Sequence, residues 1–238
     1  MKTLRALGRF LRGGIRTTAV LVFLALMVVG VLRVLPPTYT PIMFLRVYEG
    51  LFDGKLVGIE RHWIPYEQIS PNFIRAFIGA EDARFMRHHG IDWRAMEDAM
   101  RYNRAHRGRK VRGASTITMQ TAKNVFLWHG RTYVRKGFEA WFTYLIEHLW
   151  GKKRILEVYA NVVEMGDGIY GIEAAARRYF GTSASELTRR EAALIAAVLP
   201  NPRRWSPAAP TPYIKRRANW IMGRMGGVAV PKTDNLIP

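Results

Sequence analysis

The chain has 238 residues, no cysteine, and 37 Lys plus Arg against 18 Asp plus Glu, which gives a formal net charge of +19. Its length and its 49% hydrophobic content allow one ordinary globular domain with its own core. The absence of cysteine excludes disulfides, thiolate nucleophiles and cysteine-ligated zinc. The positive charge predicts an anionic partner, which could be nucleic acid, acidic lipid or a phosphorylated substrate.

The first forty residues predict a membrane anchor. Residues 1–16 are basic and contain no acid, and the uncharged run TTAVLVFLALMVVGVL follows. This run is slightly shorter than the roughly 20 residues that usually span a bilayer, but flanking arginines can snorkel and Val34 and Leu35 extend it. We therefore predict a transmembrane helix over residues 17–35, with the basic residues in the cytoplasm. A cleaved signal peptide is the alternative, but no small-residue cleavage site follows the run.

The residues after the anchor predict a linker and one mainly helical domain. The prolines of RVLPPTYTP indicate a stiff, extended linker over residues 36–42, because proline fixes φ and removes a backbone donor. The domain is expected over residues 43–226, followed by a loose tail at residues 227–238. A short strand-like stretch is predicted within residues 55–65.

Start and stop signals predict four helices within this domain. They are a helix that begins after Ser70-Pro71, a helix over residues 135–150 that stops at Gly151, a short helix over residues 173–181, and a helix that begins at the capping box Thr188–Glu191 and ends at Pro200. No internal repeat accompanies them, so a single helical domain is expected.

An acid stands on the apolar face of the first predicted helix. At about 100° per residue, Ile74, Ile78, Glu81 and Phe85 point the same way, towards whatever the helix packs on. Partial burial would raise the pKa of such a carboxyl group towards the range of a general base or acid. A core carboxylate neutralised by a nearby arginine is the alternative.

The helix predicted over residues 135–150 shows the same anomaly. Glu139 projects between Ile146 and Trp150, so it lies on the apolar half together with Arg135. The two residues could form an ordinary i,i+4 pair, although arginine before glutamate is the weaker order. With Glu81, they favour a polar cleft in an apolar helical domain.

The segment between these helices is rich in donors for anionic oxygen. Gly113 frees the backbone ahead of two hydroxyl side chains, and amide and ammonium groups then recur at helical spacing. The donors are Ser115, Thr116, Gln120, Lys123, Asn124, Arg135 and Lys136. A solvated polar face is the alternative, but the basic residues that follow make a phosphate-binding set more plausible.

Two further features lie between residues 84 and 112. His88 is retained as a candidate substrate-binding residue, although we prefer a structural role in which it hydrogen-bonds around the turn near Glu81; with His89 it predicts no zinc site. The stretch also mixes nine Arg or Lys residues with apolar side chains such as Trp93 and Met100. This mixture predicts an element at a membrane surface.

Ordered motifs in this chain resemble those of the peptidoglycan glycosyltransferases. EDARFMRHHG is similar to the signature ED-x-x-F-x-x-H-x-G, GASTITMQTAKN is similar to GGST-x-x-QQ-x-x-KN, and RKGFEA with KKRILEVYANVVEMGDGIYGIEAAARRYFG is similar to the remaining signatures. The similarity extends over residues 66–207. NVFLWHGRTYVRKG and LPNPRRW most closely resemble the monofunctional biosynthetic type of Gram-negative bacteria.

This resemblance implies a lysozyme-like, mainly α fold and an enzyme that polymerises lipid II into glycan strands with release of undecaprenyl diphosphate. It implies that Glu81 is the general base of an inverting displacement and that Glu139 is a second acid on the donor side. Lys123, Arg135 and Lys136 would bind the diphosphate, and Ser115, Thr116, Gln120 and Asn124 would position phosphate and sugar groups. Ala114 and Met119 depart from the signatures, but neither departure removes an acid or a diphosphate ligand.

The resemblance also implies partners and a location. The expected partners are lipid II, the growing lipid-linked glycan strand, membrane lipids and other cell-wall synthesis proteins, but no nucleic acid. The catalytic domain would lie in the periplasm, anchored by a single pass in the bacterial inner membrane. No cofactor is expected to be required and no metal ligand is assigned, since no carboxylate cage is evident, although Mg²⁺ or Mn²⁺ could assist.

Two rival functions remain open at this stage. A lytic glycosidase on the same fold would cleave the polymer, but it has no use for a cationic cluster around a diphosphate. A membrane-anchored binder of DNA or acidic polymer would explain the charge, but inward-facing acids serve no phosphate-backbone binder.

Overall fold

The structure is a computed structural model that describes residues 2–107, 111–130 and 132–231, with side chains described from residue 12 onward. The chain divides into two compact units, Met1–Pro36 and Pro37–Pro238. Helices contain 63% of the residues and strands 3%, so the predicted mainly α class is confirmed. Arg109 and Lys110 of the predicted basic stretch, and residues 232–238 of the predicted tail, lie outside the described residues.

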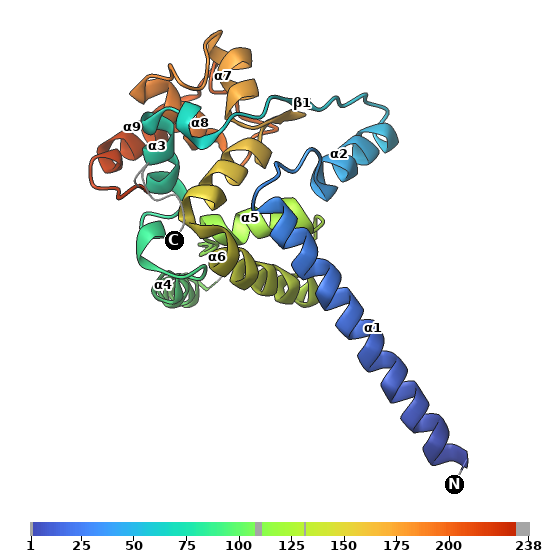
Figure 1. Ribbon diagram of the computed structural model, residues 1–238. Helices are drawn as coiled ribbons and strands as arrows, with labels where there is room; N and C mark the ends of the chain where they lie inside the picture. The colour runs from blue at the N-terminus through green and yellow to red at the C-terminus, as the bar shows by residue number, and fades with distance from the viewer. Residues whose placement is uncertain (1, 108–110, 131, 232–238) are drawn as a thin grey trace. The chain divides into compact units, whose positions relative to one another are not determined.

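The N-terminal unit consists of helix α1 (Lys2–Leu32; Figure 1). Its segment Arg12–Leu32 is long and apolar enough to cross a membrane. The predicted end at residue 35 is wrong, because the helix stops at Leu32. Beyond it, the Leu35 amide donates a hydrogen bond to the Val31 carbonyl in a turn. Pro36 explains the early end, since the residue before a proline disfavours the helical conformation.

The second unit begins with a helix where an extended linker is expected. Thr40 is the extended N-cap residue of α2 (Pro41–Phe52), and Pro41 occupies its first turn. The prediction of a linker through residue 42 is therefore wrong at its end. Proline is well suited to the first helical position, where its missing amide would have no helical partner.

A small sheet connects an early segment of this unit with one that follows α6. Strand β1 (Glu60–Arg61) pairs in parallel with β3 (Ile169–Tyr170), which pairs antiparallel with β2 (Glu164–Gly166), so the order is β1-β3-β2. The strand-like stretch predicted over residues 55–65 thus contains only a two-residue strand. The 3₁₀ turn η1 (Tyr66–Gln68) follows it.

Helices form the rest of the second unit. They are α3 (Pro71–Glu81), the 3₁₀ turn η2 (Phe85–Arg87), α4 (Trp93–Ala105), α5 (Ile117–Phe126), α6 (Tyr133–Val162), α7 (Ile172–Phe180), α8 (Arg189–Val198) and α9 (Pro212–Met225). The predicted starts after Ser70 and at the Thr188–Glu191 capping box are confirmed, and Gly181 closes α7 in the left-handed conformation as predicted. Helices α2, α4 and α9 had no predicted counterpart, and α5 was anticipated only by the helical spacing of the donors after Thr116.

The core of this unit forms where α3 packs against α8 and α9 and where α5 packs along α6. Phe73 and Phe77 of α3 are fully buried, and the Phe77 ring lies 4.3 Å from that of Tyr159 on α6. Burying one such aromatic side chain stabilises a fold by about 2–3 kcal/mol. The core therefore holds the C-terminal end of α3 against α5 and α6.

Helix α6 bends at Gly151, as the predicted helix stop indicates. Gly151 has φ 71° and ψ 163°, which only glycine adopts without strain, and a second helical segment follows it directly. The buried face of the first segment carries Arg135 and Glu139 together with Ile146 and Trp150. The predicted inward placement of this charged pair is confirmed.

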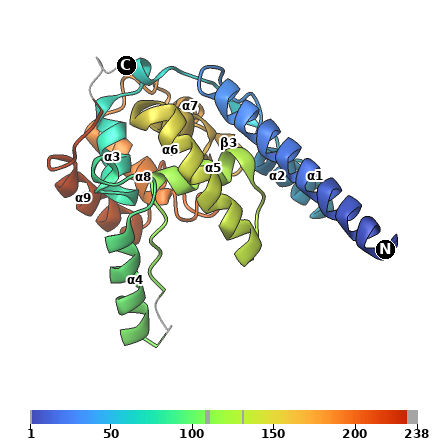
Figure 2. The same cartoon turned by 60° about the horizontal axis from the view of Figure 1, so that its bottom comes forward.

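Helix α4 projects away from the helices packed around α5 and α6, and residues 111–116 run back along it (Figure 2). Asn103 connects the two segments, because its side chain donates to the Arg112 carbonyl at 3.0 Å and accepts from the Arg112 amide at 2.7 Å. Residues 112–116 therefore line the space between α4 and the end of α3.

Candidate active site

Glu81 is the last residue of α3, and its side chain is 17% exposed. Its Oε2 accepts a 3.0 Å hydrogen bond from Gln120 Nε2, and its Oε1 lies 3.6 Å from Arg217 Nη2 of α9. The helix ends at Glu81, so the prediction that Phe85 continues the same helical face is wrong. Phe85 lies in the turn η2 and is fully buried there.

Tyr159 sets the orientation of the Gln120 amide. Its hydroxyl donates to Gln120 Oε1 at 2.7 Å, so the amide nitrogen is directed at Glu81. Burial, with a smaller contribution from the Glu81 charge, raises the pKa of the Tyr159 phenol well above its ordinary value. The phenol therefore remains a hydrogen-bond donor at neutral pH. Side chains from α5 and α6 thus orient the Glu81 carboxylate at the end of α3.

Glu139 is the second predicted acid, and it is only 2% exposed. Its Oε2 accepts from Arg135 Nη1 at 2.6 Å, and its Oε1 forms an ion pair with the Lys136 ammonium group. Lys136 also donates to Ser115 Oγ at 3.4 Å. Since Arg135 is buried as well, Glu139 balances a guanidinium that would otherwise be costly to desolvate, whereas the Lys136 side chain is 43% exposed.

Lys123 of α5 is electrostatically coupled to both acids. Burial lowers its pKa below the ordinary lysine value, the Glu139 charge opposes this, the Arg135 and Lys136 charges add to it, and the Glu81 charge again opposes it. Within the part of the chain that the structure describes, its ammonium group makes no ion pair shorter than 4.0 Å. Lys123 is thus a partly desolvated cation that an anionic ligand could neutralise.

The other predicted ligands differ in what they contact. Thr116 caps α5 by accepting from the Met119 amide, and it donates to the Gly90 carbonyl. Asn124 is buried on α5. His88 Nε2 lies 2.9 Å from Asp82 Oδ1, beside Glu81, so it has the structural contact that the sequence analysis preferred. These three side chains support the site from within the fold.

Asp82, Arg84 and Asp92 were missed by the sequence analysis. Asp82 Oδ2 accepts from the Ile117 amide at 3.0 Å, which connects the end of α3 to the start of α5. Arg84 donates to both oxygens of Asp92 at 2.8 Å. The motif position of Asp82, directly after the candidate base, was the signal available in the sequence.

The carboxylates of Asp82 and Asp92 and the imidazole of His88 lie within 4.8 Å of one another, an arrangement that could hold a metal ion. Asp92 stands four residues after His88, a spacing that the expectation of no zinc site did not include. Burial alone would raise the pKa of Asp92, but the Ala95 amide and the Arg84 guanidinium lower it. Because Arg84 already neutralises both Asp92 oxygens, these residues do not fit a resident metal ion.

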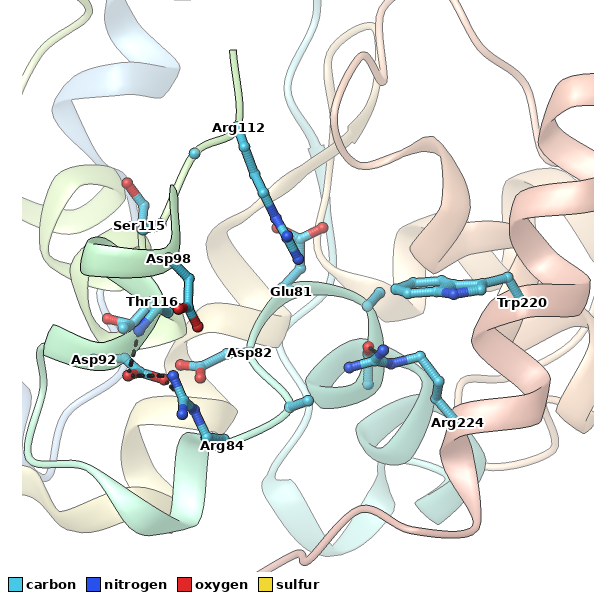
Figure 3. Close-up of a pocket in the computed structure, with 16 residues that line it drawn as sticks. Glu81, Asp82, Arg84, Asp92, Asp98, Arg112, Ser115, Thr116, Trp220 and Arg224 are labelled. Carbon is cyan, nitrogen blue, oxygen red and sulfur yellow. Dashed lines mark hydrogen bonds and ion pairs between the residues drawn. The ribbon is translucent and has the colours of Figure 1, made fainter. Parts of the chain in front are cut away.

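Two neighbouring pockets share Arg112, Ala114 and Ser115 as lining residues. The first, about 400 Å³, is lined by Glu81 and Ser115 and by Trp220 and Arg224 of α9 (Figure 3). The second, about 200 Å³, is lined by Lys136, Met119 and the apolar side of α4. Glu81 and Lys136 therefore open to adjacent pockets, which suits a reaction between two bound molecules.

Comparison with known proteins gives one consistent family. Residues 53–226 match the transglycosylase family. The chain is 52% identical to a biosynthetic peptidoglycan transglycosylase of Rhodospirillum centenum over 93% of both chains, and 49% identical to one of Caulobacter vibrioides over 93% of this chain and 96% of the other. A protein of Pseudomonas fluorescens with the same name is 50% identical over 85% of both chains.

The family match covers most of the second unit, and the relatives are similar over nearly their whole length. The mainly helical, lysozyme-like fold class expected from the motifs agrees with this family. The chain therefore belongs to the transglycosylase family and is a peptidoglycan glycosyltransferase.

Proposed function

We propose that this glycosyltransferase polymerises lipid II into glycan strands and releases undecaprenyl diphosphate, with Glu81 as the general base. One observation carries the proposal: a partly buried carboxylate at the end of α3 opens into a sugar-sized pocket, and Lys136, which pairs with Glu139 beside Arg135, lines the adjacent pocket. The pocket and the cations match the two halves of the substrate, which are a sugar and a diphosphate.

The displacement can be written with these groups alone. Glu81 takes the proton from the 4-hydroxyl of the acceptor sugar while that oxygen attacks the anomeric carbon of the donor. The bond between that carbon and the diphosphate oxygen breaks, and the configuration at carbon inverts because attack and departure occur on opposite faces. The negative charge that develops on the diphosphate would be stabilised by Lys123, Arg135 and Lys136.

Glu139 would act through the cations that it holds. Its two oxygens are paired with Arg135 and Lys136, so it fixes both side chains before the substrate binds. Ser115, within hydrogen-bonding distance of Lys136, would accept or donate to the same substrate group. A lytic glycosidase on this fold stays the alternative, but this arrangement of cations would have no role in it.

We further propose that the enzyme works at the bacterial inner membrane, anchored by α1 with the catalytic unit in the periplasm. Support comes from the basic residues that precede the apolar segment Arg12–Leu32, since positive flanks favour the cytoplasm. Trp93 and Met100 of α4 are exposed among arginines, which suits contact with lipid headgroups and tails. Such contact would bring the pockets to the lipid-linked substrate.

No resident metal ion is part of this proposal. Asp82, His88 and Asp92 are engaged with each other, with the Ile117 amide or with Arg84, and the guanidinium supplies the positive charge there. A Mg²⁺ or Mn²⁺ ion that assists would then arrive with the diphosphate rather than with the protein.

The experiment is polymerisation of labelled lipid II by the purified full-length chain in detergent or vesicles. Wild type should form glycan strands, and Glu81→Gln should lower the rate by about 10² or more, since general base catalysis typically contributes that much. Glu186→Gln, an exposed acid distant in sequence, is the control and should keep the wild-type rate. Undiminished polymerisation by Glu81→Gln at unchanged Tm would refute the proposed role.

A further inference from the structure

We propose that Trp220 of α9 is a sugar-stacking residue that holds the acceptor sugar against Glu81. This inference rests on the proposed function and names a side chain that none of the motifs above contains. Trp220 lines the same 400 Å³ pocket as Glu81, and its indole reaches from α9 towards the end of α3 (Figure 3). A residue on a helix near the C-terminus thereby becomes part of the substrate site.

The Trp220 indole contacts a guanidinium group on one face and remains partly exposed to solvent. Arg224, one turn further along α9, places its guanidinium carbon 4.5 Å from the centroid of the Trp220 ring. Arg224 Nε also donates to the Gly79 carbonyl of α3 at 3.1 Å, so the stacked pair is connected to the helix that ends at Glu81. Trp220 nevertheless remains 49% exposed. One face is thus fixed by a cation, while the rest of the ring stays open to the pocket.

The chemistry of a pyranose fits this surface. The axial C–H groups of a sugar form an apolar face that packs on an aromatic ring, and its hydroxyl groups point outward from the rim. The opposite rim of the pocket carries Glu81, Arg112 and Ser115, which can accept from or donate to those hydroxyls. A few polar groups around an apolar platform are typical of small-ligand sites.

The geometry also assigns this platform to the acceptor sugar. The pocket of Trp220 contains the candidate base, whereas Lys136 of the cationic cluster opens to the neighbouring pocket. The sugar whose hydroxyl loses a proton must lie beside the carboxylate. Stacking on Trp220 would restrict how that sugar rotates, and orientation of this kind contributes directly to rate and affinity.

The test compares Trp220→Ala, Trp220→Leu, Trp220→Phe and Trp220→Tyr in lipid II polymerisation, with kcat and KM measured separately. The alanine and leucine variants should lose about tenfold or more in kcat/KM, mainly through KM, as expected for loss of an aromatic contact. The phenylalanine and tyrosine variants should stay within about threefold of wild type, because an aromatic face remains. A purely structural role would follow apolar volume, so leucine and phenylalanine would then behave alike.

Tyr213→Ala is the matched control. Tyr213 lies on the same helix and is likewise 49% exposed, but it packs on Trp205 and does not line the pocket of Glu81. Its removal should leave KM unchanged. The stacking role would be overturned if KM rose in the control as much as in Trp220→Ala. It would also be overturned if Trp220→Ala polymerised at the wild-type rate while Glu81→Gln was inactive. Either outcome would leave the proposed function intact. A wild-type enzyme that makes no polymer would overturn both.

Discussion

The carboxylate of Glu81 and the side-chain amide of Gln120 form a 3.0 Å hydrogen bond, and Tyr159 fixes which end of that amide faces the acid. Glu81 ends α3, Gln120 lies on α5 and Tyr159 on α6. A carboxylate at a helix end is ordinarily free to rotate, so this connection across three helices is what orients it. Tyr159 is the fully buried member of this connection.

Tyr159→Phe should lower kcat several-fold and lower the free energy of unfolding by about 1 kcal/mol, because the Gln120 oxygen loses its donor and the amide can turn over. Lipid II polymerisation and denaturant unfolding measure the two effects. Tyr170→Phe is the control, since the Tyr170 hydroxyl is buried without a hydrogen-bond partner among the described residues. Equal losses in both variants would contradict the orienting role.

Lys123→Met should separate activity from stability. The substitution removes a cation proposed to stabilise the leaving diphosphate, so the rate should fall by about tenfold or more. Because burial disfavours the charged form of Lys123, methionine should also raise Tm at neutral pH. A variant that loses activity and Tm together would indicate that Lys123 supports the fold.

The pH dependence of this Tm difference follows from the lowered pKa of Lys123. Lys123 binds its proton more tightly in the unfolded chain than in the folded chain, so protonation of Lys123 lowers the unfolding free energy of the wild type. This destabilisation is complete below the folded-state pKa and disappears as pH rises to the ordinary lysine value of 10.5. The Tm advantage of Lys123→Met should therefore be largest at neutral pH and close as pH approaches 10.5. Calorimetry at several pH values measures it, and an advantage that grows with pH would contradict the assignment.

Glu139→Gln should cost about 3–5 kcal/mol of unfolding free energy, because it leaves the buried Arg135 guanidinium without its anion. The double variant Arg135→Met/Glu139→Gln should recover part of that loss, since the unpaired charge is gone. Both variants should polymerise lipid II poorly if Arg135 binds the diphosphate. Polymerisation restored to the wild-type rate in the double variant would show that Arg135 is not a substrate ligand.

Chelation should distinguish a protein-held metal from one carried by the substrate. After EDTA treatment and removal of the chelator, the enzyme should bind no Mn²⁺ at Asp82, His88 and Asp92, because Arg84 already neutralises Asp92 and Asp82 is engaged by His88 and the Ile117 amide. Isothermal titration with MnCl₂ measures this directly. Stoichiometric Mn²⁺ binding that disappears in Asp92→Asn would contradict it, and Arg84→Met serves as the variant in which such binding could be gained.

Local signals predicted several elements correctly because they act within a few residues. A serine followed by proline begins α3, a capping box begins α8, and Gly151 interrupts α6, each through backbone groups that lie next to one another in the chain. Helices α4 and α9 were not predicted, although Asp92 caps α4 and Thr211, followed by Pro212, caps α9 through signals of the same local kind.

The candidate site divides in the same way. The placement of Glu81, Arg135 and Glu139 on inward helical faces was readable from periodicity, and the motif order identified the family. Nothing local indicated that Arg217 and Trp220 approach Glu81, since they lie more than a hundred residues away along the chain. Their approach is set by the packing of α9 against α3.

The sequence by itself indicated a basic, mainly helical glycosyltransferase with one apolar N-terminal helix, and the residue types of its chemistry. The tertiary structure alone decided that Glu81 accepts a hydrogen bond from Gln120, that Glu139 pairs with two cations, and that Trp220 lines the same pocket as the candidate base. The physical reason is that periodicity states only which side of a helix a residue faces. Which helices then meet depends on burying apolar surface across distant parts of the chain.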